Sequence, residues 1–174
     1  PHYDGYHPQQ QIVFQYSLHK LEKQVGESFH YEHISLVDDD PTLPLLERLK
    51  DDIGNSGTVI VWNKSFEMTM NKEMAKLHPE YTAFLEQLNE RIYDLGDIFN
   101  LGYYLHPGFK GSWSIKHVLP VMVPELSYKG MAIGKGDQAS MAWWNMTFGQ
   151  VDQREKEQLT EALLRYCELD TLAM

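Results

Sequence analysis

The segment "TVIVW", residues 58–62, is an uninterrupted run of apolar and β-branched side chains. Such a run is typical of a strand buried on both faces, as in a parallel sheet. The residues that follow carry apolar side chains at helical spacing, namely Phe66, Met70, Met74 and Leu77. This pattern predicts a helix over 63–81 and therefore an α/β domain, in which the carboxyl end of the strand is where ligands bind.

Upstream of this unit, residues 12–22 and 28–37 are rich in aromatic and β-branched side chains. They predict two strands that form a hairpin, with a turn near Gly26. Residues 38–57 begin with turn residues and continue with leucines and an isoleucine at helical spacing, which predicts a helix closing on Gly54 and Gly57.

Downstream, residues 83–99 predict a helix followed by a short strand that ends around Asp94, and residues 100–113 form an aromatic loop. Ser114 is placed as an N-cap before an amphipathic turn, which Pro120 and Pro124 are expected to interrupt. A glycine-rich connector over 127–140 precedes one or two final helices over 141–174. No internal repeat is present.

Composition limits the function classes. A chain of 174 residues with 43% hydrophobic content is expected to form a single domain over 1–174. The single cysteine and the lack of an apolar run of roughly 18 residues predict a soluble, cytoplasmic protein without a membrane segment. The net charge of -10 argues against a basic polyanion-binding face, although a nuclease that holds divalent metal ions with carboxylates remains compatible with it.

The last helix sorts its residues into two faces. Its apolar stripe consists of Leu159, Leu163, Tyr166 and Asp170. Asp170 is therefore predicted to point inward, where a carboxylate costs several kcal/mol unless it is paired, hydrogen-bonded or metal-bound. The alternative is a carboxylate that the helix end leaves exposed. Because the chain begins with Pro1 and ends without a helix stop signal, we expect it to be truncated at both ends.

Two polar segments resemble motifs of the DnaQ-like, or DEDD, exonucleases of the ribonuclease H-like superfamily. "NKSFE", residues 63–67, resembles the second motif through Asn63, Phe66 and Glu67, and Tyr166 to Asp170 resembles the YxxxD third motif. The segment "GSWSIKHVLP", with Lys116, is similar to the helix between these motifs. Together with "FQYSLH" they resemble an uncharacterised bacterial domain family of that superfamily, often attached behind a RecB-like nuclease domain.

The resemblance implies a ribonuclease H-like mixed β-sheet flanked by helices and a metal-dependent 3'-5' exonuclease that acts on single-stranded DNA or RNA. Two Mg²⁺ or Mn²⁺ ions would activate a water and stabilise the leaving oxygen. Asp170 and Glu67 would be metal ligands, and Tyr166 would hydrogen-bond the attacking water. Asn63 and Phe66, from the second motif, would contact the substrate.

Two further lysines are substrate-binding candidates. Lys110 lies in the aromatic loop, which mixes aromatic rings with a cation as single-strand binders do, and Lys116 lies in the helix between the motifs. Asp94, at the end of its strand, resembles a superfamily acid that is usually structural and is a weak site candidate.

The chain departs from the family pattern in two ways. Glu67 stands where the usual acid is Asp and is one methylene longer. The first motif, a strand bearing DxE, is absent and is expected upstream of Pro1. Since that strand lies between the hairpin and "TVIVW" in this fold, we expect "QYSLH" and "TVIVW" not to pair directly.

Several residues also have plainer interpretations. Glu67 is placed to favour the helix dipole, and Asn63 is placed to cap the same helix. His30 and His33 have metal-like spacing, but residues three apart on a strand face opposite ways. For the whole chain, the alternative to an enzyme is a catalytically degenerate relative that binds nucleic acid or a partner within a larger nuclease. DNA or RNA preference and oligomeric state stay open.

Overall fold

A computed structural model describes residues 3–22 and 26–174 and shows a mixed α/β fold. The elements are, in chain order, β1 (Gln15–Glu22), β2 (Glu27–Ile34), α1 (Thr42–Ile53), β3 (Val59–Val61), α2 (Lys64–Leu77), α3 (Thr82–Glu90), β4 (Ile92–Asp94), α4 (Asp97–Asn100), α5 (Ile115–Met122), α6 (Gly136–Phe148) and α7 (Gln153–Leu172). Two short 3-10 helices, Pro79–Tyr81 and Pro107–Phe109, complete the order.

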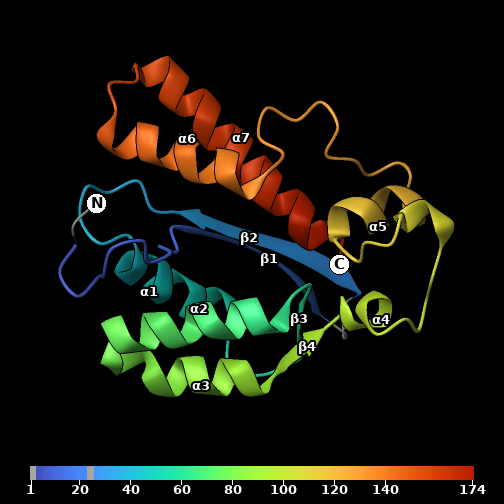
Figure 1. Cartoon of the computed structure of the whole chain (residues 1–174). Helices are drawn as coiled ribbons and strands as arrows, with labels where there is room; N and C mark the ends of the chain where they lie inside the picture. Colours follow the sequence, from blue (N-terminus) through green and yellow to red (C-terminus); the bar gives the residue numbers. More distant parts are fainter. Residues whose placement is uncertain (1–2, 23–25) are drawn as a thin grey trace.

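The predicted hairpin forms the middle layer of the molecule (Figure 1). Strands β1 and β2 are antiparallel, with Gln15 opposite Ile34 and Glu22 opposite Glu27. Gly26, with a φ of 67°, ends the turn in the left-handed region that favours glycine, while residues 23–25 lie outside the described part of the chain. Helices α6 and α7 lie on one side of the hairpin, and α1, α2 and α3 lie on the other (Figure 1).

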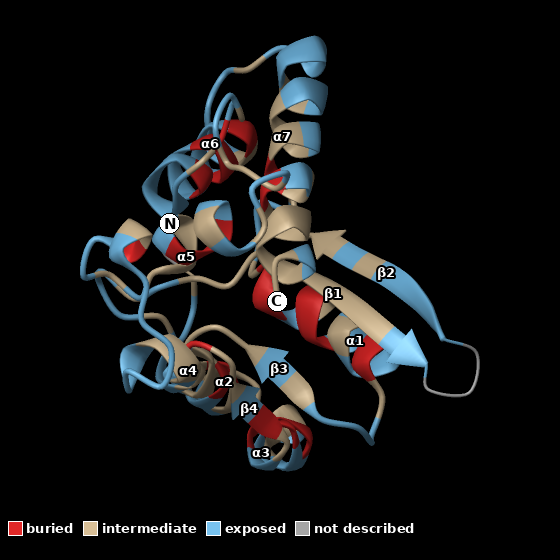
Figure 2. Ribbon diagram, turned by 90° about the vertical axis from the view of Figure 1, so that its right-hand side faces the viewer, coloured by how far each residue is buried: buried red, intermediate tan, exposed pale blue. Residues whose placement is uncertain are grey.

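Because successive side chains of a strand point to opposite faces, the hairpin contributes to two hydrophobic cores. Tyr16 and Leu18 pack against the first core, which consists of Leu45, Leu46, Ile53, Met74, Phe84, Leu85 and Leu88. The other face contributes to a second core, which consists of Ile133, Ala139, Ala142, Trp143, Met146, Leu163 and Tyr166. Figure 2 shows buried residues on the helices of both layers.

The predicted "TVIVW" strand does form a parallel pair. Val59 lies opposite Ile92 and Val61 opposite Asp94, so β4 ends at Asp94 as expected. The expectation that β3 is buried on both faces is wrong, since Val59 packs on the first core whereas Ile60 is 49% exposed. The side chains alternate, and β3 pairs only with β4 among the described residues.

The two pairs of strands are separate sheets. In the described residues β1 pairs only with β2, and no backbone pairing joins β1 to β3. The expectation that "QYSLH" and "TVIVW" do not pair directly is therefore confirmed.

Helix boundaries mostly follow the sequence signals. Helix α1 ends before Gly54, and the last segment forms two helices, α6 and α7. Helix α5 differs from expectation, because it continues through Pro120 to Met122, and Ser114 stands at its N-cap position without a side-chain capping hydrogen bond. None of the described helices is long and apolar enough to cross a membrane.

Candidate active site

Helix α7 carries Tyr166 and Asp170 on the face that packs against the rest of the molecule. The Asp152 carboxylate caps the start of this helix by accepting a hydrogen bond from the Glu155 amide at 2.8 Å. Leu163 is fully buried, and Tyr166, three residues later, is 9% exposed. Asp170, one turn beyond Tyr166, is half-buried, so the prediction that its carboxylate points inward is confirmed.

The hydrogen-bond partner of Asp170 is Tyr128, in the connector between α5 and α6. Its hydroxyl donates to Asp170 Oδ1 at 2.5 Å. Burial raises the pKa of Asp170, while the hydrogen bond from Tyr128 and the positive charge of Lys116 act in the opposite direction. Burial, followed by the interaction with Asp170, raises the pKa of Tyr128. Tyr128 is therefore a neutral donor that satisfies a carboxylate in a largely desolvated position.

Lys116, on α5, brings a positive charge to the two tyrosines. Its Nζ donates a hydrogen bond to the Tyr166 hydroxyl at 3.1 Å. The same nitrogen lies 5.2 Å from the ring centroid of Tyr166 and 5.5 Å from that of Tyr128, within the range of cation–π attraction. Lys116, Tyr128, Tyr166 and Asp170 thus form one cluster, which joins α5, the connector and α7.

Glu67 reaches toward this region from the first turn of α2. It is half-buried, and burial raises its pKa. The pKa of the Cys167 thiol is raised to about 12, mainly by burial and further by the charges of Asp170 and Glu67. Both carboxylates therefore lie within electrostatic range of the same thiol. Within the described residues, the Glu67 carboxylate has no ion-pair partner.

Asn63 is the N-cap residue of α2, which is one of the two roles considered for it from the sequence. Its side-chain Oδ1 accepts a hydrogen bond from the Phe66 amide at 3.2 Å and another from the Ser65 hydroxyl at 2.8 Å. Asn63 therefore caps α2 and sets the direction in which Glu67 leaves the first turn. Phe66 was predicted to lie on the apolar stripe of this helix, but it is 45% exposed. The residues that α2 buries, such as Met74, lie in its later turns.

Asp94 ties together three chain segments. Its Oδ2 accepts from the Lys64 amide at 2.7 Å, and its Oδ1 accepts from the Gly96 amide at 2.9 Å. A Cβ at Gly96 would lie 2.3 Å from the Trp62 carbonyl oxygen, so only glycine allows this close approach. With both oxygens bound to backbone amides, Asp94 holds the start of α2 against the end of β4.

One part of the aromatic loop is buried against the protein, and another part is exposed to solvent. Phe109 is buried and packs edge-on against Phe99, whereas Tyr103 is 78% exposed. Lys110 is exposed in a left-handed conformation directly after the 3-10 turn. A groove of about 480 Å³ runs along this loop and is lined by residues that include Phe99, His106 and Trp113.

Comparison with known families matches residues 1–114 to the model described as a domain of unknown function, DUF2779. The chain belongs to the DUF2779 family. The matched range covers Asn63, Phe66, Glu67, Asp94 and Lys110 and ends before α5.

Among curated proteins, the DUF2779 chain is 34% identical over 131 residues to "Uncharacterized protein UU173" of Ureaplasma parvum. It is 32% identical over 126 residues to "Uncharacterized protein MG366 homolog" of Mycoplasma pneumoniae, and 30% identical to "Uncharacterized protein MG366" of Mycoplasma genitalium. Each match covers 66% of this chain and 19% of the relative, so the chain spans about a fifth of these proteins. No solved structure matches it significantly.

Two features of the DUF2779 chain were not predicted from its sequence. Tyr128 lies in a glycine-rich connector without periodicity, so no local signal pairs it with Asp170. His19 and His30 are direct cross-strand partners. The hairpin register around Gly26 was the signal that could have brought these two histidines together.

Proposed function

We propose that this DUF2779 chain belongs to a metal-dependent 3'-5' exonuclease that degrades single-stranded DNA or RNA. The observation that supports the proposal most is the half-buried Asp170, whose pKa is raised by burial and which lies one turn from Tyr166 on α7. A desolvated carboxylate beside a tyrosine matches the YxxxD motif in chemistry as well as in spacing. We also propose a cytoplasmic location, which fits a chain with one thiol.

The donor set fits hard divalent ions. Glu67 and Asp170 supply carboxylate oxygens, which Mg²⁺ and Mn²⁺ prefer, and the Glu67 oxygens have no cationic partner in the described chain. Ions held by these carboxylates would lower the pKa of a bound water and would stabilise charge on the leaving oxygen. Two carboxylates are too few to hold two ions, and we propose that acids of an upstream DxE strand complete the set.

The remaining residues have roles that do not depend on the ions. The Tyr166 hydroxyl accepts from Lys116 Nζ, and burial and the charge of Asp170 raise its pKa, so it would stay protonated when it hydrogen-bonds the attacking water. Lys116 offsets negative charge that a phosphate brings to the cluster. The exposed Tyr103, together with Trp113 and Lys110, provides rings for base stacking and a cation for the backbone. Asn63 and Asp94 act as positioning residues for α2.

The second candidate is a degenerate relative that binds nucleic acid or a partner, such as a RecB-like nuclease domain, without cutting. Two observations favour it. The Tyr128 hydroxyl already donates a hydrogen bond to Asp170 Oδ1 at 2.5 Å, and Glu67 stands where the family motif has Asp. Under this alternative the Tyr128 hydrogen bond replaces the metal as the partner of the carboxylate.

The test uses the protein with the residues that precede Pro1 and a 5'-labelled single-stranded oligonucleotide with Mn²⁺. Asp170→Asn removes a ligand charge without changing shape and is expected to abolish degradation. Glu161→Gln, on the exposed face of α7, is the matched control and should retain activity. Equal degradation by wild type and Asp170→Asn would overturn the assignment. A wild type that binds the oligonucleotide without shortening it would support the degenerate alternative.

A further inference from the structure

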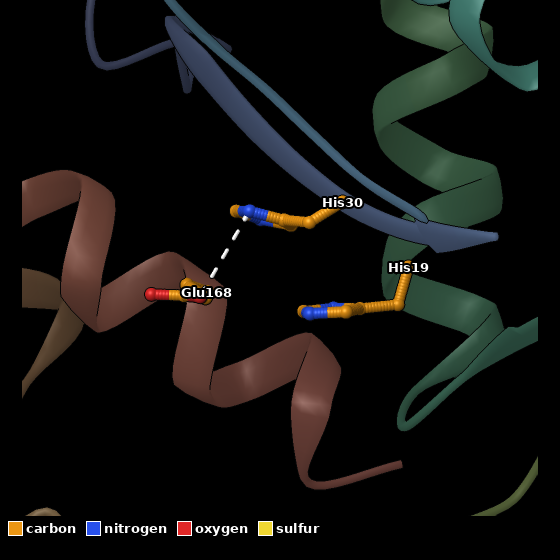
Figure 3. Close-up of side chains that lie close together, drawn as sticks. All are labelled: His19, His30 and Glu168. Atoms are coloured by element: carbon orange, nitrogen blue, oxygen red, sulfur yellow. Dashed lines mark ion pairs between the residues drawn. The ribbon is translucent and has the colours of Figure 1, made fainter. Parts of the chain in front are cut away.

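A second cluster lies where α7 faces the hairpin (Figure 3). His19 on β1 and His30 on β2 are direct cross-strand partners, and their rings are stacked with centroids 4.5 Å apart. Glu168 on α7 approaches them, with its Oε1 3.9 Å from His30 Nδ1. One ligand atom from each of the three residues lies within 4.8 Å of the other two.

Two hydroxyl groups orient the histidine rings. Thr171 Oγ1 donates to the Glu168 carbonyl oxygen at 3.1 Å and lies 2.8 Å from both His19 Nδ1 and Ser17 Oγ. Ser17 Oγ also lies 2.9 Å from His30 Nε2. A metal-bound neutral imidazole carries its proton on the nitrogen that does not bind the ion, so His19 Nδ1 and His30 Nε2 would donate to these hydroxyl groups when His19 Nε2 and His30 Nδ1 bind an ion.

We propose that His19, His30 and Glu168 bind one Zn²⁺ ion. Two neutral imidazoles and a carboxylate are a donor set that Zn²⁺ takes with a fourth position open to water. In a tetrahedral site with bonds of about 2.0–2.1 Å, ligand atoms stand roughly 3.3 Å apart, so ligand atoms that now lie within 4.8 Å of one another must close by up to ~1.5 Å. The half-exposed Glu168 side chain can approach by rotation. The His19 and His30 rings, which are stacked with an interplanar angle of 21°, must also turn so that both lone pairs point at the ion. Imidazole nitrogens favour Zn²⁺ over Mg²⁺.

The surroundings supply the remaining requirements of a metal site. Ser17 and Thr171 hydrogen-bond the non-ligating nitrogens, which is the usual arrangement around ligating histidines. Glu32 and Glu168 both line an open groove of about 840 Å³ along α7 and β2, which gives an ion a path from solvent. The bound ion would fasten the last turns of α7 to the hairpin. The site shares no ligand with the proposed nuclease centre.

The test is calorimetric titration of Zn²⁺ into the chelator-treated protein. We expect one ion per chain in the wild type and an affinity at least ~100-fold lower in His30→Gln, since loss of a ligand costs more than loss of a residue that only hydrogen-bonds a ligand. His33→Gln is the matched control, because His33 is on the same strand but faces the other way, and it should bind as the wild type does. Glu168→Gln, on the helix surface, repeats the ligand test without touching the hairpin.

Two further variants separate this site from the nuclease proposal. Thr171→Val should weaken Zn²⁺ binding by about 10-fold, because it frees the His19 ring. Asp170→Asn should leave Zn²⁺ binding unchanged. No saturable binding by the wild type, binding by Glu168→Gln equal to wild type, or loss of binding in Asp170→Asn would overturn the zinc site. None of these outcomes depends on nuclease activity.

Discussion

The carboxyl group of Asp170 is held where its charged form is disfavoured. Burial raises its pKa above the ordinary value, so the folded protein binds this proton more tightly than the unfolded chain does. The stability linked to this group is therefore greatest below the unfolded pKa and decreases as pH rises through the folded pKa. A desolvated carboxylate of this kind is typical of a residue kept for chemistry at a cost in stability.

Asp170→Asn should consequently stabilise the protein at pH 7. The amide oxygen can still accept the Tyr128 hydrogen bond, and the desolvation cost of the charge is removed. We expect an increase in the free energy of unfolding within the ~0.5–2 kcal/mol range of single stabilising changes. Urea denaturation at several pH values should show the difference growing from pH 3 to pH 7. Glu161→Gln should show no such growth, and a destabilised Asp170→Asn at pH 7 would contradict the prediction.

Of the two residues in the Tyr128–Asp170 hydrogen bond, the sequence predicted the position of Asp170 but not that of Tyr128. The inward direction of Asp170 follows from a periodicity that repeats every few residues along α7, which is local information. Tyr128 is 42 residues away in a connector without a pattern, so its contact depends on how the chain packs.

At the start of α2, one residue both matches a sequence motif and caps the helix. Asn63 fits the second-motif pattern, and the same side chain accepts from the Phe66 amide at the start of the helix. Asn63→Ala should therefore cost about 1 kcal/mol of stability whatever its role in catalysis. Thermal denaturation should show this loss, while Asn63→Asp keeps an acceptor oxygen and should lose little. Equal stability of the alanine and aspartate variants would contradict the capping role of Asn63.

Element positions were predictable where a local stop signal exists. Gly54 ends α1, and β4 ends at Asp94, as the sequence indicated. The exposure of Ile60 was not predictable, because it depends on which faces of β3 other elements cover. The path of α5 through Pro120 was also missed, since proline normally interrupts a helix and only the surrounding packing decides otherwise.

At the scale of the whole molecule, the hairpin packs against both hydrophobic cores, one on each face. Leu46 belongs to the first core and Leu163 to the second, and both are fully buried. Leu46→Ala and Leu163→Ala should each destabilise the protein by about 2–5 kcal/mol. Because both cores need the hairpin, each variant should shift one common transition, seen alike by tryptophan fluorescence, to which buried Trp143 contributes, and by far-UV circular dichroism. Transitions that separate between the two probes would show that the cores unfold independently.

The α/β class and the order of elements were predictable at this scale, because strand and helix patterns alternate along the chain. That "QYSLH" and "TVIVW" do not pair directly was expected from the family resemblance rather than from periodicity. The approach of His19 and His30 to Glu168 joins residues almost 150 positions apart, and no single-segment pattern contains it.

The position of Cys167 also determines how the protein behaves toward oxidants. Burial and the nearby carboxylates raise the pKa of this thiol, so very little of it is ionised at pH 7, and only the ionised form attacks another sulfur. The folded protein should therefore stay free of intermolecular cross-links in air without added reductant. Disulfide-linked dimers in a stored sample would then mark molecules whose last helix has come away from the hairpin.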